Sequence, residues 1–265
     1  MDDDVHRYIL EVDQTVSAVL EPAGFVGSYL HGSLALGSYY RPKSDIDLLF
    51  VVDQPLPLDR RHELWNELAA LSDRRPTTGD IEASVLLKAT AQQAGPPFLY
   101  EVHYSESMWA EAEDGVPPQS GLGGEDPDLA IHLAVVSSTG VTVSGEPANE
   151  VFAPIPENVY RAAVQEDIDW ILAGRHIIET PFYGVLNLCR WLMQEANGWD
   201  RPTSKDAAGM WALEHTPPHL HQIVAQGLAC YRSPEDVAPE ERRTDGHDWD
   251  TVQLLKFRDH LRNLQ

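Results

Sequence analysis

Hydrophobic residues in the first half of the chain follow two patterns, helical spacing and short continuous runs. Apolar positions recur every three to four residues over 3–20 and 58–71, which places them on one face of a helix. Other segments are short runs rich in Val, Ile, Leu and Phe, which are typical of buried strands. These runs, at 26–31, 46–52, 81–87 and 98–104, predict strands and a mixed α/β half.

The second half of the chain shows helical spacing almost throughout. Pro117, Pro118 and the glycines of 121–124 mark a linker before it. We therefore expect an α+β fold, with an N-terminal α/β domain containing a mixed sheet over 1–120 and a C-terminal all-α helical bundle over 121–265. A ligand cleft between two such domains is the default expectation. The predicted helices cover 126–138, 157–173, 181–197, 204–214, 218–231 and 248–264.

The net charge of the chain indicates which classes of molecule it can bind. Nineteen Lys and Arg stand against 42 Asp and Glu, a formal net charge of −23. Phosphate backbones need a basic surface, so we expect no nucleic-acid partner. An acidic field would attract a small cationic substrate, but general solubility or adaptation to salt explains the charge equally well.

The cysteines and the first residues of the chain indicate in which cellular compartment the protein acts. Cys189 and Cys230 lack the spacing of metal ligands, and Cys189 lies in an apolar helical run, which favours a reducing environment. The start, Met1-Asp2-Asp3-Asp4, is unlike a basic signal peptide, and no apolar stretch is long enough to cross a membrane. We expect a cytoplasmic protein with no membrane partner, acting as a monomer.

The residues best suited to bind a metal ion and phosphate lie in one motif. Gly32-Ser33 is followed after eleven residues by Asp45-Ile46-Asp47 at the start of an apolar run. In a strand, residues two apart share a face, so both carboxylates point the same way. Such a pair is costly without a cation, and hard oxygen ligands suit Mg²⁺ that also binds substrate phosphates. The N–H and hydroxyl of Ser33 in the Gly32-Ser33 turn can donate to phosphate oxygens.

This motif resembles the signature of the nucleotidyltransferase superfamily related to DNA polymerase beta. With Ser44 before it and Leu48-Leu49 after it, it is most similar to aminoglycoside adenylyltransferases of the streptomycin/spectinomycin type. The resemblance covers nearly the whole chain and implies that 1–120 is a nucleotidyltransferase domain. It further implies that Asp45 and Asp47 are metal ligands.

A third carboxylate should come from a neighbouring strand. Asp80 and Glu82 both stand at the start of the 81–87 run. The resembled family has a Glu leading a short strand here, which matches Glu82 as metal ligand, general base and acceptor contact. The alternative is that Glu82 only keeps an edge strand soluble.

Other matching positions imply an ATP site. Ser44 and Asp128 match nucleotide contacts of the family, although Asp128 could equally be a helix cap. Arg190, in an otherwise apolar helix, and Lys205, before Asp206-Ala207-Ala208, match phosphate-binding positions. A local salt bridge is the alternative role for each cation.

The acceptor side is less defined. A polyamino sugar needs carboxylates and aromatic platforms, for which Trp109, Trp170 and Glu179 are candidates beside Glu82. The family's streptomycin-binding segment pairs a Trp with an Asp five residues later. Here Arg175 stands at that interval from Trp170, which puts streptomycin in doubt and favours spectinomycin or another hydroxyl compound.

The resemblance implies transfer of AMP from ATP, with Mg²⁺, to a hydroxyl of an aminoglycoside-type antibiotic, conferring resistance. One alternative is a nucleotidyltransferase that modifies a different small molecule or a protein hydroxyl. The other alternative is a non-catalytic nucleotide-binding module, which the retention of all three carboxylates disfavours.

Overall fold

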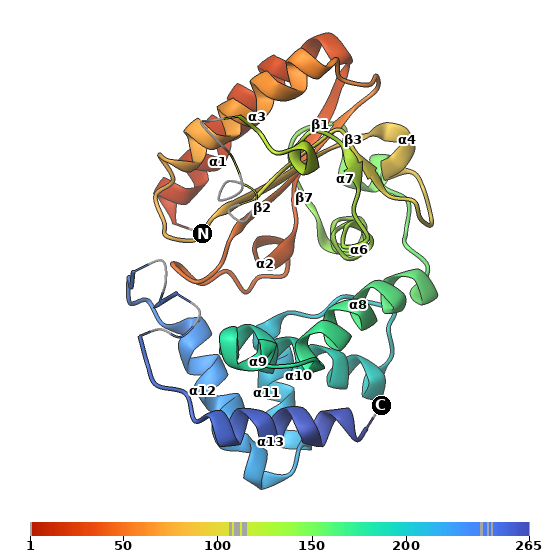
Figure 1. Ribbon diagram of the computed structural model, residues 1–265. Coiled ribbons are helices and arrows are strands. Elements are labelled where there is room, and N and C mark those ends of the chain that lie inside the picture. The colour runs from red at the N-terminus through yellow and green to blue at the C-terminus, as the bar shows by residue number, and fades with distance from the viewer. Residues whose placement is uncertain are drawn as a thin grey trace. The chain divides into compact units, whose positions relative to one another are not determined.

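The computed structural model describes residues 2–105, 108, 112, 116–238, 241–242, 244 and 246–264. The chain divides into two compact units (Figure 1). The first unit comprises Met1–Tyr39 and Asp45–Val159, and the second comprises Tyr40–Ser44 and Tyr160–Gln265. Among the described residues, no helix combines the length and hydrophobicity needed to span a membrane.

A mixed sheet forms the centre of the first unit. Its strand order is β5-β3-β2-β1-β7, and β2 and β3 run parallel while the other neighbours are antiparallel. A separate two-stranded sheet pairs β4 with β6. The predicted α+β class with a mixed sheet is confirmed. The strands are β1 (Phe25–Leu30), β2 (Ile46–Val52), β3 (Ile81–Leu87), β4 (Leu99–Tyr100), β5 (Val102–Tyr104), β6 (Gly124–Glu125) and β7 (Val141–Gly145).

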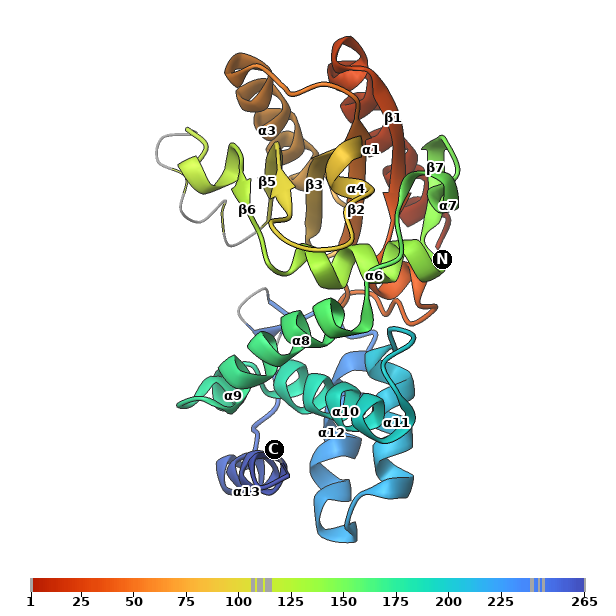
Figure 2. The ribbon, with the colours of Figure 1, turned by 90° about the vertical axis from the view of Figure 1, so that its right-hand side faces the viewer.

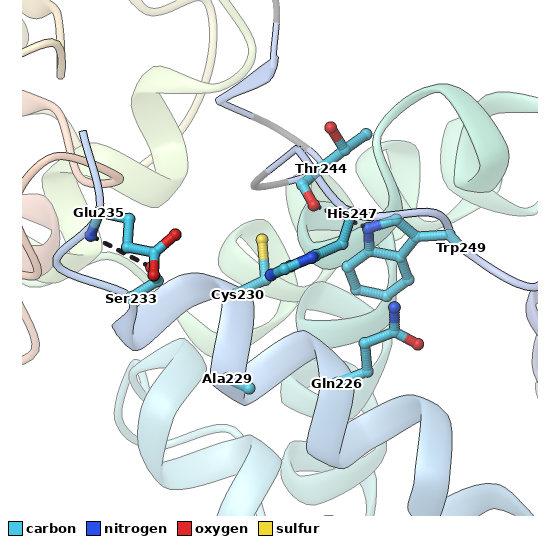
Figure 3. Close-up of a pocket in the computed structure, with 8 residues that line it drawn as sticks. All are labelled: Gln226, Ala229, Cys230, Ser233, Glu235, Thr244, His247 and Trp249. Atoms are coloured by element: carbon cyan, nitrogen blue, oxygen red, sulfur yellow. Dashed lines mark hydrogen bonds between the residues drawn. The ribbon is translucent and has the colours of Figure 1, made fainter. Parts of the chain in front are cut away.

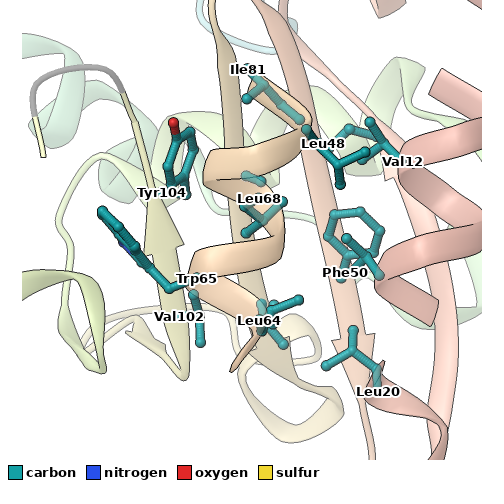
Figure 4. Packing of buried hydrophobic residues seen from close by; sticks show 14 of the residues in the cluster. Val12, Leu20, Leu48, Phe50, Leu64, Trp65, Leu68, Ile81, Val102 and Tyr104 are labelled. Atoms are coloured by element: carbon teal, nitrogen blue, oxygen red, sulfur yellow. The ribbon is translucent and has the colours of Figure 1, made fainter. Parts of the chain in front are cut away.

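Two long helices, α1 (Asp3–Leu20) and α3 (Leu58–Ser72), lie side by side along one face of this sheet (Figure 2). Their apolar faces pack against alternate residues of β2, including Leu48 and Phe50, which are fully buried (Figure 4). The intervening residues of β2 point to the opposite face. Leu49 is buried there too, so β2 is an apolar central strand with its only acidic residue near its start.

Short helices complete the first unit. Helix α6 packs on α2 and α7. The strand β7 pairs with β1, so residues 121–159 have their contacts in the first unit, whereas the sequence placed them after a boundary at 120. The shorter elements are α2 (Gly32–Ala35), α4 (Lys88–Ala91), α6 (Leu129–Thr139), α7 (Ala148–Val151) and 3-10 turns at Glu21–Ala23 and Gln119–Gly121.

The second unit is built from helices, within the part of the chain that the structure describes. Helix α10 packs against α9, α11, α12 and α13 through side chains such as Val185 and Leu186, which are fully buried. Ser204 caps α11 by accepting the Ala207 N–H at 3.1 Å. The helices are α8 (Glu157–Leu172), α9 (His176–Glu179), α10 (Pro181–Asn197), α11 (Lys205–His215), α12 (His221–Arg232) and α13 (Thr251–Arg262), with a 3-10 turn at Pro218–Leu220.

Candidate active site

The Gly32-Ser33 turn and the acidic pair lie together in the first unit. Gly32 begins α2 with a φ of +55°, and a Cβ at this position would lie 1.7 Å from Asp47 Oδ2. The His31 N–H donates to the Asp47 carbonyl at 3.2 Å. Only glycine leaves room for a carboxylate directly over the turn, which explains why a Gly stands here.

The three predicted acidic residues converge at the start of β2 and β3. Asp47 and Glu82 are register partners on these parallel neighbours, so their side chains share a face. Asp45 precedes β2 by one residue, and its Oδ1 accepts the backbone N–H of Asp80 at 2.8 Å. The structure therefore brings Asp45, Asp47 and Glu82 to one end of the sheet.

Asp80, the other candidate third carboxylate, is committed elsewhere. It is 5% exposed, accepts the Ser72 hydroxyl at 3.0 Å and lies 4.0 Å from Arg75 Nε. The side chain of Glu82 is 31% exposed. Of the two acids, Glu82 thus has the more exposed side chain, while the backbone N–H of Asp80 holds the Asp45 carboxylate.

Negative charge accumulates around Glu82. Burial, followed by the charges of Asp45, Asp126, Asp128 and Asp80 in that order, raises the pKa of Glu82 to about 8. A carboxyl held among like charges binds either a proton or a cation. Among the described residues, no group of three or more acidic, His or Cys side chains is already placed to hold a metal ion.

His132, which the sequence pattern did not single out as a site residue, borders Glu82 and in turn contacts His31. His132 Nε2 lies 3.7 Å from Glu82 Oε1, and its ring centroid is 4.7 Å from that of His31. Burial, with the nearby His132 and His103, holds the pKa of His31 well below its usual range. The available signal was the spacing of His132 from Asp128, four residues earlier, which places His132 one turn after the N-cap residue of α6.

Ser33 and Asp128 present polar groups near these carboxylates. Ser33 Oγ is buried and has no hydrogen-bond partner among the described residues. Asp128 occupies the N-cap position of α6 but makes no side-chain capping hydrogen bond, and it is exposed. An unsatisfied buried hydroxyl is costly, so Ser33 is suited to donate to a ligand.

The predicted phosphate-binding cations share one neighbourhood of the second unit. Burial raises the pKa of Asp167, and the charges of Arg190 and Lys205 act in the opposite direction. Tyr183 donates its hydroxyl to Asp167 Oδ1 at 3.0 Å, and Lys205 Nζ lies 4.9 Å from the Tyr183 ring centroid. Arg190 Nη1 donates to Asn187 at 3.1 Å. Arg190 and Lys205 therefore face a common acidic group.

Ser44 belongs to the second unit as well. Its Oγ accepts the Tyr40 N–H at 3.0 Å and lies 3.4 Å from the Tyr231 hydroxyl. Lys205 Nζ is 5.9 Å from the Tyr231 ring centroid. Two of the predicted nucleotide contacts, Ser44 and Lys205, thus approach the same tyrosine.

Comparisons with known proteins show which proteins this chain is similar to. Residues 150–249 match the model of the aminoglycoside adenylyltransferase C-terminal domain. A spectinomycin 9-adenylyltransferase from Staphylococcus aureus is 29% identical over 209 residues, which are 77% of each chain. An aminoglycoside (3'') (9) adenylyltransferase from Shigella flexneri is 28% identical over 244 residues, 88% of this chain and 87% of that one. The predicted resemblance to aminoglycoside adenylyltransferases is confirmed.

A solved structure shows the same fold. It is a spectinomycin adenyltransferase from Enterococcus, crystallised with ATP and spectinomycin. It superposes with a TM-score of 0.76 over 97% of this chain and 99% of its own, at 21% identity. The adenylyltransferase class predicted from the motif is the class to which all three of these relatives belong.

Besides Glu82, the predicted acceptor contacts are Trp109, Trp170 and Glu179, which lie apart from the acidic group in sequence. Trp170, on α8, is 44% exposed, and its ring stacks on His176 with centroids 4.2 Å apart. Glu179 is exposed at the end of α9. Trp109 lies outside the described residues. The structure thus offers Trp170 as an exposed aromatic surface.

A separate pocket of about 210 Å³ lies in the second unit (Figure 3). It is formed by α12 and the segment after it, with Cys230, Glu235, His247 and Trp249 among its eight lining residues. None of the predicted site residues lines this pocket.

Proposed function

We propose that the protein transfers AMP from ATP to a hydroxyl of a spectinomycin-type antibiotic. The observation that carries the proposal is the convergence of Asp45, Asp47 and Glu82 beside a turn that only glycine permits. Two relatives that are 29% and 28% identical to this chain are named as a spectinomycin and an aminoglycoside adenylyltransferase.

Mg²⁺ fits the donor set of this site. Carboxylate oxygens are its preferred protein ligands, and the register of β2 and β3 places Asp45, Asp47 and Glu82 at one end of the sheet, where a divalent cation would offset their charge. Asp45, Asp47 and Glu82 would hold the ion. When bound, the metal neutralises the triphosphate and polarises the phosphorus that is attacked.

The side chains of the protein have distinct proposed roles. Glu82 accepts the proton of the acceptor hydroxyl as that oxygen attacks the α-phosphorus of ATP and pyrophosphate leaves. Arg190 and Lys205 bind the phosphates and offset the charge on the leaving pyrophosphate. Ser33, through its unsatisfied hydroxyl, donates to a phosphate oxygen. Ser44 and Asp128 contact the nucleotide, as the family pattern implies.

The proposed acceptor rests on the net charge of the chain and on Arg175, which stands where the streptomycin pattern has an Asp. A net charge of −23 attracts a cationic antibiotic. Trp170 offers a ring face, and Glu82, Glu179 and Trp109 are the remaining candidate contacts. Arg175 would repel a cation where the streptomycin pattern has an acid, so we propose spectinomycin as the preferred acceptor. We also propose that the protein acts as a monomer.

Transfer of radiolabelled AMP from ATP to spectinomycin, streptomycin and a panel of related compounds tests the function. We expect a spectinomycin product that requires Mg²⁺, and loss of transfer by about 100-fold or more in Glu82→Gln and Asp47→Ala. Glu63→Gln, an exposed glutamate on α3, is the matched control and should retain activity. Full AMP transfer by Glu82→Gln would refute the proposed base.

Labelling of protein rather than of any small molecule would favour the alternative, a nucleotidyltransferase that modifies protein. ATP binding by calorimetry without transfer to any acceptor would favour a non-catalytic nucleotide-binding module. Either result would refute the proposal that the protein transfers AMP to an antibiotic.

A further inference from the structure

The five residues Tyr40–Ser44 interrupt the first unit and have their contacts in the second. The Tyr40 hydroxyl donates to Asp206 Oδ1 at 3.0 Å, and Arg232 Nε donates to the same oxygen at 2.5 Å. Asp206 lies in the first turn of α11 and Arg232 in the last turn of α12. One carboxylate therefore ties this segment to the adjoining ends of two helices.

The segment is compact and held at several points. The N–H groups of Lys43 and Ser44 both donate to the Tyr40 carbonyl at 2.8 Å, which closes a tight turn. Lys43 is 3% exposed, and its ammonium donates to the Glu235 carbonyl at 2.9 Å. Arg242 donates to the Lys43 carbonyl at 2.9 Å. Since the turn is internally bonded, moving Tyr40 moves Ser44 with it.

The hydrogen bond between Tyr40 and Asp206 matters for the nucleotide site because of where Asp206 lies in the sequence. Asp206 directly follows Lys205, whose ammonium approaches the ring of Tyr231 while Ser44 approaches the Tyr231 hydroxyl. The Tyr40 ring also packs edge-on against Tyr231 with centroids 5.2 Å apart, so the hydroxyl bond to Asp206 is the contact of Tyr40 that reaches α11, and the ring contact is one that reaches α12.

We propose that Asp206 is a positioning residue for nucleotide binding, which through Tyr40 holds Ser44 in place beside Lys205. This inference rests on the proposed function, in which Ser44 and Lys205 contact ATP. In this role Asp206 acts through the Tyr40 hydroxyl and not by contact with the nucleotide. An acid next to a phosphate-binding lysine would by its charge repel ATP, and the hydrogen bond to Tyr40 gives this acid a role that offsets that repulsion.

The sign of the effect separates positioning from simple electrostatics. If Asp206 acted on ATP only as a negative charge, Asp206→Ala would tighten ATP binding. If it positions Ser44, Asp206→Ala and Tyr40→Phe should both weaken ATP binding. Asp206→Asn keeps an acceptor oxygen for Tyr40 and should retain most of the affinity.

The experiment measures ATP affinity by calorimetry with Mg²⁺, and the steady-state constants for ATP at saturating spectinomycin, on the full chain. We expect the Kd and KM for ATP to rise about tenfold in Asp206→Ala and Tyr40→Phe, with kcat within about twofold. The double variant should be no weaker than Asp206→Ala, because both changes break one connection.

Two controls match the substitutions. Glu195→Ala breaks an exposed ion pair with Arg161, and Tyr8→Phe removes a hydroxyl that donates to the Leu71 carbonyl. Both should leave ATP affinity unchanged. Unchanged or tighter ATP binding in Asp206→Ala, with only a lowered melting temperature, would overturn the inference. Failure of the unaltered protein to bind ATP would instead refute the proposed function, and the inference with it.

Discussion

Replacement of Gly32 by alanine tests the close approach of the turn to the acidic pair. The added Cβ would lie 1.7 Å from Asp47 Oδ2, whereas ordinary van der Waals contact begins at 3.4 Å. The carboxylate must therefore move by about 1.7 Å, the difference between these two distances. Misplacement of a catalytic group by about 1 Å can cost on the order of 100-fold in rate.

Gly37 provides the matched control for the backbone effect. Its φ is +68°, close to the +55° of Gly32, but an added Cβ would meet nothing within 4 Å. Alanine at either position carries the strain of the left-handed conformation, roughly 1–2 kcal/mol. Both variants should therefore lose about 2–4 °C of melting temperature for each kcal/mol.

Activity should distinguish the two variants. We expect Gly32→Ala to lower kcat/KM for AMP transfer by about 100-fold, and Gly37→Ala to change it by less than about threefold. Thermal unfolding followed by circular dichroism, on the same preparations, checks that both proteins are folded. Equal activity of the two variants would refute the reasoning that Asp47 must occupy the space over Gly32.

Two further outcomes concern stability. Asp13 accepts the hydroxyls of Ser28 and Ser144, the latter at 2.7 Å. Asp13→Ala should therefore lower the free energy of unfolding, measured with urea, by about 2 kcal/mol, and a loss below about 0.5 kcal/mol would contradict this. Arg232 and Tyr40 lower the pKa of Asp206 below its ordinary 3.8. Because the folded pKa is depressed, the stability that Asp206 adds, about 1 kcal/mol for this partly exposed pair, is full above about pH 4 and lost as pH falls through the folded pKa. Wild type and Asp206→Asn should therefore converge in acid, and a constant difference down to about pH 2 would disprove the linkage.

The elements that depend on local pattern could be predicted from the sequence. The alternation of β2 placed Asp45 and Asp47 on one face, and α10 spans the expected residues 181–197. These features need only the periodicity of a strand or a helix. The strand β7 was not predicted, because five residues with partly exposed side chains acquire their strand character from pairing with β1.

The choice between Asp80 and Glu82 needed tertiary structure. The two acids lie two residues apart, so the alternation of a strand places both side chains on the same face and cannot distinguish them. Ser72, at the end of α3, and Arg75, just after it, distinguish them by engaging Asp80. Contacts of this kind join residues from different elements of the fold, and no spacing rule records them.

The few lysines of the chain show how an acidic protein can still bind a polyanion. Lysine occurs only at positions 43, 88, 205 and 256. Lys43 is buried in the anchored segment, and Lys205 begins the helix to which that segment is tied through Asp206. Because the bulk charge of −23 repels ATP, favourable binding must come from a few cations held at short range. Contacts that fix the surroundings of Lys205, such as the one between Tyr40 and Asp206, should therefore influence ATP affinity more than any change in surface charge far from them.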